Sequence, residues 1–361
     1  MPVPSSILWQ NETKTIVLLD LPRSLEEAQV PSRKLGTSPL RRIVSAQPLA
    51  IPFSTPEPRR GGTLRPSSSS TQVSELMTRG YVDAALGEIS SSHTGPWCLD
   101  RVIASPASPE GGPEGLLHAP TTGQDTNDVI IPEEARYHLG TIDDGRAEVM
   151  QEPPFHLIVL DPPWPNHSAR RKKGGYQVAD DFAAVRELLF TVPITSHLCS
   201  DGLLGVWITN APRVSEMLTS AGGIFAGWGV ELVDEWTWLK VTAHGDPVVS
   251  LDSEWRKPWE RLLIAARPGR TRVTSGQRKV IFSVPDTHSR KPNLRGLLEP
   301  LMPPDYRAME VFARNLTAGW TAWGNQVLHF QHRRFWAAMD DGGDDTRVED
   351  GENDANIAMA I

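Results

Sequence analysis

Short apolar runs alternate with longer amphipathic stretches from about Asn127 onward, and turn residues separate them. Apolar runs of four to eight residues are typical of buried strands, and apolar residues spaced by three and four are typical of helices. The pattern predicts strands at residues 155–160, 203–209, 230–241, 261–266, 280–284, 308–313 and 319–323, with helices at 181–189, 211–220 and 292–301. Strands that alternate with helices predict an α/β sandwich with a mostly parallel sheet. In such folds ligands bind beyond the carboxyl ends of the strands.

The first 126 residues follow a different pattern. One strand is predicted at residues 15–21, with a polar helical stretch after it. Residues 53–72 contain 13 Ser, Thr, Pro or Gly in 20 positions, and residues 105–123 are similar, so neither stretch has enough apolar surface to order itself. A short helix is predicted between them, at 73–86. We therefore expect a partly ordered N-terminal segment (1–52), a low-complexity region with a short helix (53–126), a folded domain (127–339) and an acidic disordered tail (340–361).

The acidic tail accounts for most of the net charge of −8. Residues 340–354 contain eight acidic side chains and one arginine, which leaves a net charge of about −1 on the rest of the chain. The charge of the whole chain therefore neither favours nor excludes a nucleic-acid partner.

Length and composition favour a soluble intracellular protein. A chain of 361 residues, 39% of them apolar, can form two ordinary domains or one large one. Two cysteines, Cys98 and Cys199, allow at most one disulfide and fit a reducing compartment. No stretch approaches the roughly 20 apolar residues of a membrane span, and no signal peptide is visible at the N-terminus. We expect a nuclear or cytoplasmic protein with no membrane partner.

The predicted strand 155–160 ends in an unusual tetrapeptide, Asp161-Pro162-Pro163-Trp164. Proline has a fixed φ and no N–H, so the two prolines form a rigid bend whose carbonyl oxygens point in a set direction. A carboxylate and a backbone carbonyl held side by side are two acceptors, and Trp164 is predicted to offer a flat face for a base. The plainer interpretation is a turn with a solvated acid.

Two acceptors beside an aromatic face match the amino group of adenine, which has two N–H donors on a flat ring. Drawing both hydrogens toward acceptors favours a more tetrahedral nitrogen, whose lone pair can attack a methyl group carried on a sulfonium. Positioning and preorganised electrostatics would supply the rate gain, since no strong base is needed.

The segment after the tetrapeptide combines polar side chains, glycines and four consecutive cations. The side chains concerned are Asn166, Ser168, Arg170, Arg171, Lys172 and Lys173. Beside a base pocket they predict a loop that contacts phosphates. A plain solvated loop is the other interpretation.

These residues resemble the adenosine N6-methyltransferase family named for the seventy-kilodalton MT-A subunit, and the branch of methyltransferase-like protein four within it. The resemblance covers about residues 129–339. It rests on Asp161-Pro-Pro-Trp-Pro-Asn166-His-Ser168, Leu251-Asp-Ser253 with Lys257-Pro-Trp-Glu260, Ser283-Val-Pro-Asp-Thr-His288-Ser-Arg-Lys291-Pro, Glu310-Val-Phe-Ala-Arg314-Asn315-Leu, and Gly319-Trp-Thr-Ala-Trp-Gly324-Asn325-Gln326.

The resemblance implies a Rossmann-like methyltransferase sandwich that uses S-adenosylmethionine. Its strand order is circularly permuted, so the catalytic motif precedes the cofactor strand at residues 309–313. This order agrees with the absence of an early G-x-G-x-x-G motif.

Site residues follow from the same resemblance. Catalysis is assigned to Asp161, Pro162, Pro163 and Trp164. Substrate contacts are assigned to Asn166, Ser168, Arg170, Arg171, Lys172, Lys173, Lys257 and Glu260. Cofactor contacts are assigned to Ile142, Asp161, Lys291, Glu310, Arg314, Asn315, Asn325 and Gln326.

Elementary chemistry agrees with the cofactor assignments in outline. Lys291 suits the methionine carboxylate of the cofactor, while Arg314, Asn325 and Gln326 suit its ribose and adenine. The family commonly has an acid at Thr141 or its neighbour, and this chain has Asp143 one place later. No metal is expected, since His288 has no partner at ligand spacing, and Trp236 with Trp238 is expected to pack in the core.

The function implied is methyl transfer to N6 of adenine in RNA, small nuclear RNA included, or in DNA. A non-catalytic RNA-binding scaffold of the same fold and an enzyme for another planar amine are the alternatives. The sequence leaves open the choice of nucleic acid, and whether the protein is a monomer or a heterodimer with a related subunit.

Overall fold

The computed structural model describes residues 5–36, 41–54, 69–103, 128–165, 182–253, 256–269, 278–287 and 289–337. The predicted phosphate loop at 166–173, His288 and the acidic tail at 340–361 lie outside these ranges.

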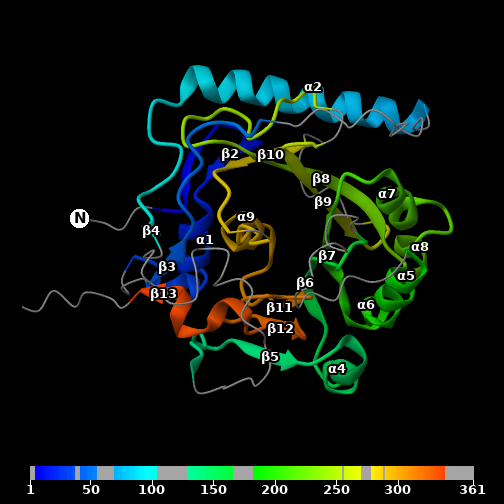
Figure 1. Cartoon of the computed structure of the whole chain (residues 1–361). Coiled ribbons are helices and arrows are strands. Elements are labelled where there is room, and N and C mark those ends of the chain that lie inside the picture. The colour runs from blue at the N-terminus through cyan, green and yellow to red at the C-terminus, as the bar shows by residue number, and fades with distance from the viewer. Residues whose placement is uncertain are drawn as a thin grey trace, which may run out of the picture.

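One large sheet organises the described part of the chain (Figure 1). Its strand order is β1-β2-β10-β8-β9-β7-β6-β11-β12-β5. The strands are β1 (Ile7–Gln10), β2 (Ile16–Leu19), β5 (Arg136–Leu139), β6 (Phe155–Leu160), β7 (Leu198–Ile208), β8 (Glu231–Lys240), β9 (Trp259–Ala266), β10 (Lys279–Ser283), β11 (Ala308–Val311) and β12 (Thr321–Gly324).

All strands of this sheet run parallel except β1 at one edge and β9 in the middle. β9 lies between β7 and β8 and pairs antiparallel with both. Its first residues, Trp259 and Glu260, therefore reach the same edge of the sheet at which the parallel strands end. The predicted α/β class with a mostly parallel sheet is confirmed.

Helices cover both faces of the sheet because its strands are apolar on both sides. In β6, Ile158 and Leu160 pack on one face, and Leu157 and Val159 pack on the other. The first face is covered by α4 (Ile142–Val149), α5 (Phe182–Thr191), α7 (Pro212–Thr219) and α8 (Ile224–Trp228), with the short α6 (Ile194–His197) beside them. The second is covered by α1 (Leu21–Glu27) and α9 (Arg295–Leu298).

Two further elements flank the sheet. A small sheet has the order β13-β3-β4, formed by Trp336–Ala337, Arg42–Ser45 and Val102–Ile103. The long helix α2 (Ser69–Ser92) packs on β8 and β10 through Val82, Ala85 and Ile89. Short 3-10 turns occur at Ser32–Lys34 (η1), Glu299–Leu301 (η4), His329–Gln331 (η5) and Arg333–Phe335 (η6).

Every strand predicted from the apolar runs is present; β6 has the predicted ends, and each of the other strands is shifted at one end or both. β7 begins at Leu198, five residues before the predicted start, and α2 extends beyond the predicted 73–86 at both ends. The helix predicted at 292–301 is instead one turn of α9 followed by η4, because Pro300 cannot donate a helical hydrogen bond. Trp236 and Trp238 are buried in the core, as predicted.

The N-terminal segment is part of the large sheet. β2 pairs parallel with β10, and α1, predicted as polar, is almost entirely buried. Its charged residues Arg23 and Glu26 are buried as an ion pair.

The division of the chain at residue 127 stays a prediction. Both cysteines are free, and no helix of the described part is long and apolar enough to cross a membrane.

Candidate functional site

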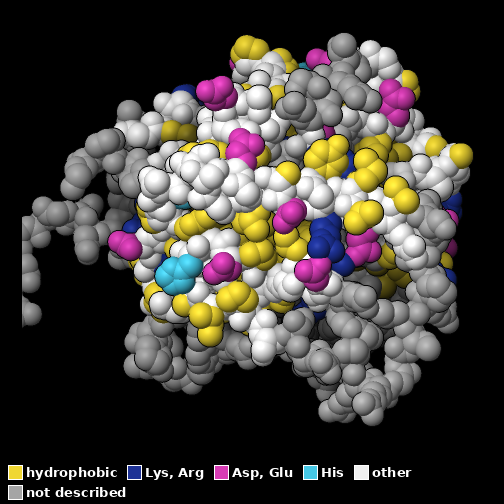
Figure 2. Space-filling model, turned by 90° about the horizontal axis from the view of Figure 1, so that it is seen from above, with side chains coloured by type: hydrophobic (Ala, Val, Ile, Leu, Met, Phe, Trp, Pro, Cys, Tyr) yellow, Lys and Arg dark blue, Asp and Glu magenta, His cyan; other side chains and the backbone are white. Residues whose placement is uncertain are grey.

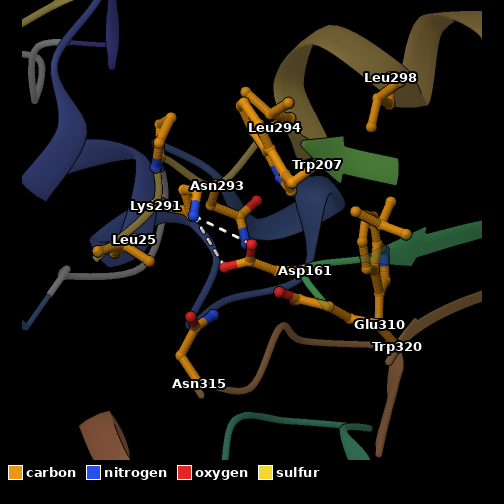
Figure 3. Close-up of a pocket in the computed structure, with 12 residues that line it drawn as sticks. Leu25, Asp161, Trp207, Lys291, Asn293, Leu294, Leu298, Glu310, Asn315 and Trp320 are labelled. Carbon is orange, nitrogen blue, oxygen red and sulfur yellow. Dashed lines mark hydrogen bonds and ion pairs between the residues drawn. The ribbon is translucent and has the colours of Figure 1, made fainter. Parts of the chain in front are cut away.

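A pocket lies at the edge of the sheet where the parallel strands end (Figure 3). Asp161 comes directly after β6, Glu310 lies in β11, and Lys291 follows β10. Its other lining residues are Leu25, Val159, Trp207, Pro292, Asn293, Leu294, Leu298, Asn315 and Trp320. The empty space bounded by these residues, counting the part open to solvent, is about 410 Å³.

Four charged side chains of alternating sign connect the pocket to the middle of the sheet. Lys291 Nζ lies 3.0 and 2.9 Å from the two carboxylate oxygens of Asp161 and 3.2 Å from Glu260 Oε2. Glu260 in turn pairs with Lys240, the last residue of β8. The side chains of Lys291, Asp161, Glu260 and Lys240 are 20%, 24%, 25% and 28% exposed. We call these four residues the charge chain.

The charge chain fixes the protonation of Lys291 and Glu260. Burial alone would lower the pKa of Lys291, but the carboxylates of Asp161 and Glu260 outweigh it and hold that pKa above its usual value. Burial would raise the pKa of Glu260, and the ammonium groups of Lys291 and Lys240 instead lower it to about 2. Lys291 and Glu260 are therefore both ionised at neutral pH.

The pKa of Glu310 is shifted in the opposite direction from that of Glu260. Burial, followed by the nearby charge of Asp161, raises its pKa to about 8, and Lys291 offsets only part of this rise. Glu310 is therefore mostly protonated at neutral pH, so the pocket can present a carboxylate and a carboxylic acid side by side.

We expect Glu310→Gln to change how stability depends on pH. The pKa of Glu310 in the folded protein, about 8, exceeds the ordinary value of 4.5, so its stability contribution is complete below pH 4.5 and is lost as the pH rises toward 8. Glutamine removes this loss, so the variant should gain stability relative to wild type between pH 5 and 8, on the order of 1 kcal/mol after solvent screening. Urea unfolding of both proteins at pH 5 and pH 8 measures this gain. If the free energies of unfolding of variant and wild type differed by the same amount at both pH values, the expectation would be contradicted.

Trp164 is placed differently from the sequence prediction. Its side chain is only 6% exposed and packs among core residues, and its indole Nε1 donates a hydrogen bond to the carbonyl of Trp207 (2.7 Å). The ring therefore holds the bend in place and does not offer an open face for a base. Trp207 is the aromatic residue of β7 that lines the pocket.

The two prolines form the rigid bend that their sequence predicts. The backbone N–H of Trp164 donates to the carbonyl of Pro162 (2.8 Å), which closes a tight turn. A carbonyl oxygen has two lone pairs, so that of Pro162 keeps one acceptor position.

The remaining predicted cofactor residues also follow strands of this edge. Asn315 lines the pocket, and the Arg314 guanidinium lies over the Phe330 ring at 5.0 Å. Asn325 is exposed and Gln326 half-buried, directly after β12. Ile142 differs, since its side chain is 4% exposed and packs in the core.

Backbone contacts nevertheless bring the start of α4 to the same edge. Gly140 N donates to Gly324 O at 3.4 Å, and Thr141 caps the helix through a reciprocal pair of hydrogen bonds with Asp144. Asp143, which lies one residue after the position where the family commonly has an acid, is exposed.

Two predicted substrate residues are engaged within the protein. Lys257 pairs with Glu75 of α2 and lies 5.7 Å from the Trp259 ring. Glu260 belongs to the charge chain. Lys240 and Trp207 were not predicted as site residues, although each lies near the carboxyl end of a predicted strand, and that position is the signal that could have identified them.

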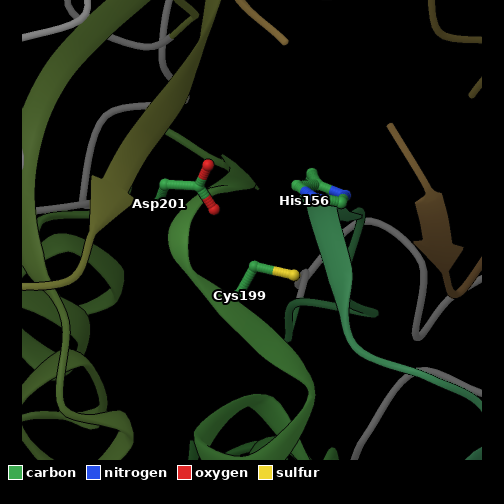
Figure 4. Close-up of side chains that lie close together, drawn as sticks. All are labelled: His156, Cys199 and Asp201. Atoms are coloured by element: carbon green, nitrogen blue, oxygen red, sulfur yellow. The ribbon is translucent and has the colours of Figure 1, made fainter. Parts of the chain in front are cut away.

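A separate cluster lies near the beginnings of β6 and β7 (Figure 4). His156, Cys199 and Asp201 have ligand-type atoms within 4.8 Å of one another. The backbone N–H of Arg307 donates to His156 Nδ1 (3.2 Å), so a neutral ring carries its proton on Nε2. Neither nitrogen then offers a metal ion an unused lone pair, and we assign the cluster no ligand.

Comparison with known proteins agrees with this geometry. The family model described as MT-A70 matches residues 155–326, which run from the start of β6 to just after β12. A protein of Cryphonectria parasitica named N6-methyladenosine RNA methyltransferase MTA1 is 47% identical over 337 residues, covering 92% of this chain and 94% of that protein. The protein of the same name from Pyricularia oryzae is 44% identical over 364 residues, covering 92% and 96%.

A human protein named N(6)-adenine-specific methyltransferase METTL4 is also similar. It is 32% identical over 225 residues, which cover 59% of this chain and 46% of the human protein. The branch named from the sequence is therefore among the relatives, at lower identity than the two fungal proteins.

Proposed function

Because the chain belongs to the MT-A70 family, we propose that it is an enzyme that transfers the methyl group of S-adenosylmethionine to N6 of adenine in RNA. The observation that carries this proposal is the Asp161 carboxylate, which Lys291 holds in a pocket at the carboxyl edge of the sheet. RNA is the proposed substrate because two relatives, 47% and 44% identical over nearly their whole length, are named RNA methyltransferases.

The pocket residues fit the charges of the proposed cofactor. S-adenosylmethionine has a carboxylate, an ammonium and a sulfonium group. Lys291 is the cation that can pair with the carboxylate, while Asp161 and Glu310 can face the positive groups. Arg314, Asn315, Asn325 and Gln326 are assigned to the ribose and adenine, and Ile142 to the edge of the adenine.

In the proposed reaction Asp161 orients the target amine. Its carboxylate accepts one N–H of the adenine amino group, and the Pro162 carbonyl accepts the other. When bound, the cofactor supplies an electrophilic methyl group. The N6 lone pair forms the new N–C bond as the S–C bond breaks, and N6 then loses one proton to water. Lys291 keeps the Asp161 carboxylate aimed throughout.

The proposal also includes the strand order and the substrate residues that the family implies. The acid after β6 precedes β11 in the chain, which supports the circularly permuted strand order. Asn166 and Ser168 are assigned to the substrate, together with Lys257 once it separates from Glu75. We also propose that the protein acts in the nucleus or the cytoplasm.

Methyl transfer to matched oligonucleotides tests the proposal. The full chain is incubated with labelled S-adenosylmethionine and either RNA or DNA of the same sequence, and the products are digested to nucleosides. We expect label in N6-methyladenosine from RNA. Label from DNA alone would overturn the choice of substrate. Binding of RNA without any transfer would instead favour the non-catalytic scaffold.

Changing the four consecutive cations at residues 170–173 tests whether the nucleic acid passes over them. We expect replacement of Arg170, Arg171, Lys172 and Lys173 with Ala to weaken RNA binding and to reduce its salt dependence, because each phosphate contact releases counterions. Cofactor affinity should stay near that of wild type. Binding isotherms at several salt concentrations measure the slope, and an unaltered slope would return the run to a plain solvated loop.

A further inference from the structure

α2 has an apolar face toward solvent as well as one toward the sheet. Val82, Ala85 and Ile89 are buried beneath it. On the opposite side Val73, Leu76 and Met77 are 56%, 67% and 48% exposed. Figure 2, which looks down on α2, shows hydrophobic side chains gathered over its N-terminal half. Surface helices normally place polar residues outward, so an apolar outer face indicates a partner.

The outer face changes from large to small residues along the helix. Its N-terminal half begins with Val73, Leu76 and Met77, and from the middle of the helix onward the face carries Gly80, Ala84 and Gly87. With 3.6 residues per turn, these six positions share one face. We call them the α2 stripe. A Cβ added to Gly80 or Gly87 would meet no heavy atom within 4 Å, so the space above these glycines is open in the described structure.

This gradient matches an antiparallel copy of the same helix. If two copies of α2 cross near residues 80–81 about a two-fold axis, the large half of each stripe lies on the small half of the other. The large and small halves of a single α2 stripe are therefore complementary in size to those of a second copy. A parallel copy would instead place large residues on large ones and leave the glycine end empty.

Charges beside the stripe fit the same arrangement. Arg79 and Asp83 lie on one flank, and the two-fold axis places Arg79 of each copy opposite Asp83 of the other. Arg79 also contacts Asp252 of its own chain, and both side chains are exposed there. Tyr81 lies on the other flank and is 47% exposed, near the proposed axis.

We propose that the α2 stripe is the interface of a homodimer in which two copies of α2 pack antiparallel. This interface lies on the outer face of α2, and none of the residues of the α2 stripe lines the pocket. Dimerisation therefore does not depend on the proposed methyl transfer, and the two can fail separately.

Sedimentation of the full chain tests the interface. We expect a monomer–dimer equilibrium at total concentrations up to about 100 μM, above the micromolar Kd of a modest interface. Leu76→Glu with Met77→Glu should give monomer throughout. Leu232→Glu, which changes an exposed leucine of β8 outside the stripe, should behave like wild type. Circular dichroism and cofactor affinity check that each variant is folded.

Charge reversal tests the orientation. Arg79→Asp and Asp83→Arg should each raise the dimer Kd at least about tenfold, since like charges then face each other across the axis. An equimolar mixture of the two variants should recover a heterodimer. Gly87→Leu should also weaken the dimer, because it fills the space meant for a large residue of the partner, while the folded monomer keeps its stability.

Three results would overturn the proposal. One is wild-type monomer at every concentration, which would mean that another protein or an undescribed segment of this chain covers the stripe. Another is a dimer that survives the double glutamate change. The last is a pair of charge-reversed variants that does not associate on mixing, which would exclude the antiparallel arrangement.

Discussion

Replacing Asp161 with Ala is expected to lower kcat for methyl transfer by about a hundred- to a thousandfold. The carboxylate is the acceptor that orients the adenine amine, and loss of one preorganised group of this kind costs about 3–4 kcal/mol in the transition state. Asp161→Asn should lose most of the activity too, because an amide keeps one acceptor oxygen but not the charge paired with Lys291. Single-turnover transfer to an RNA oligonucleotide measures the effect.

A matched control separates this effect from general damage. Asp201→Ala removes an exposed carboxylate near the beginning of β7, away from the pocket, and should leave transfer near the wild-type rate. Cofactor affinity of Asp161→Ala should fall far less than its rate. Wild-type turnover in a folded Asp161→Ala protein would remove Asp161 from the catalytic assignment.

Replacing Lys291 with Met should weaken cofactor binding by about 10- to 100-fold. A charge-assisted hydrogen bond contributes about 1.5–3 kcal/mol, and Lys291 is the cation of the pocket that can pair with the cofactor carboxylate. The loss also leaves Asp161 and Glu260 without the ammonium group between them, so the pKa of Glu260 should rise from about 2. Calorimetry with S-adenosylmethionine measures the affinity.

Lys240→Met provides the comparison for Lys291. Lys240 pairs with Glu260 but is not among the residues that line the pocket, so its loss should change cofactor affinity much less. Equal losses in the two variants would show that the charge chain acts as one electrostatic unit. Unchanged affinity in Lys291→Met would exclude Lys291 from the cofactor site.

The central strands were predictable because they are buried on both faces. Residues 155–160 are apolar except for His156, and β6 occupies that range. The position of Asp161 at the pocket followed from the same run, since the residue after a parallel strand lies at the ligand-binding edge. The predicted family was confirmed by the family model that matches residues 155–326.

Long-range pairing explains what the sequence did not reveal. β2 lies beside β10, and no local pattern records a partner so distant in the chain. The burial of Trp164 depends on the backbone of Trp207 in the next strand, so the tetrapeptide alone could not distinguish a core residue from a stacking face. The roles assigned to Arg314, Asn325 and Gln326 stay predictions.

The antiparallel direction of β9 has a consequence for how this enzyme can diverge. β8 ends and β9 begins at the edge of the sheet where the pocket lies, so the connection between Lys240 and Trp259 leaves and re-enters the sheet at the ligand-binding edge. Chain can be added to such a hairpin at small entropic cost and without disturbing the sheet. Lys257, assigned to the substrate, is carried on this hairpin. Grafting hairpins of other lengths between the same two strands should therefore alter which nucleic acid is accepted while the cofactor is bound as before.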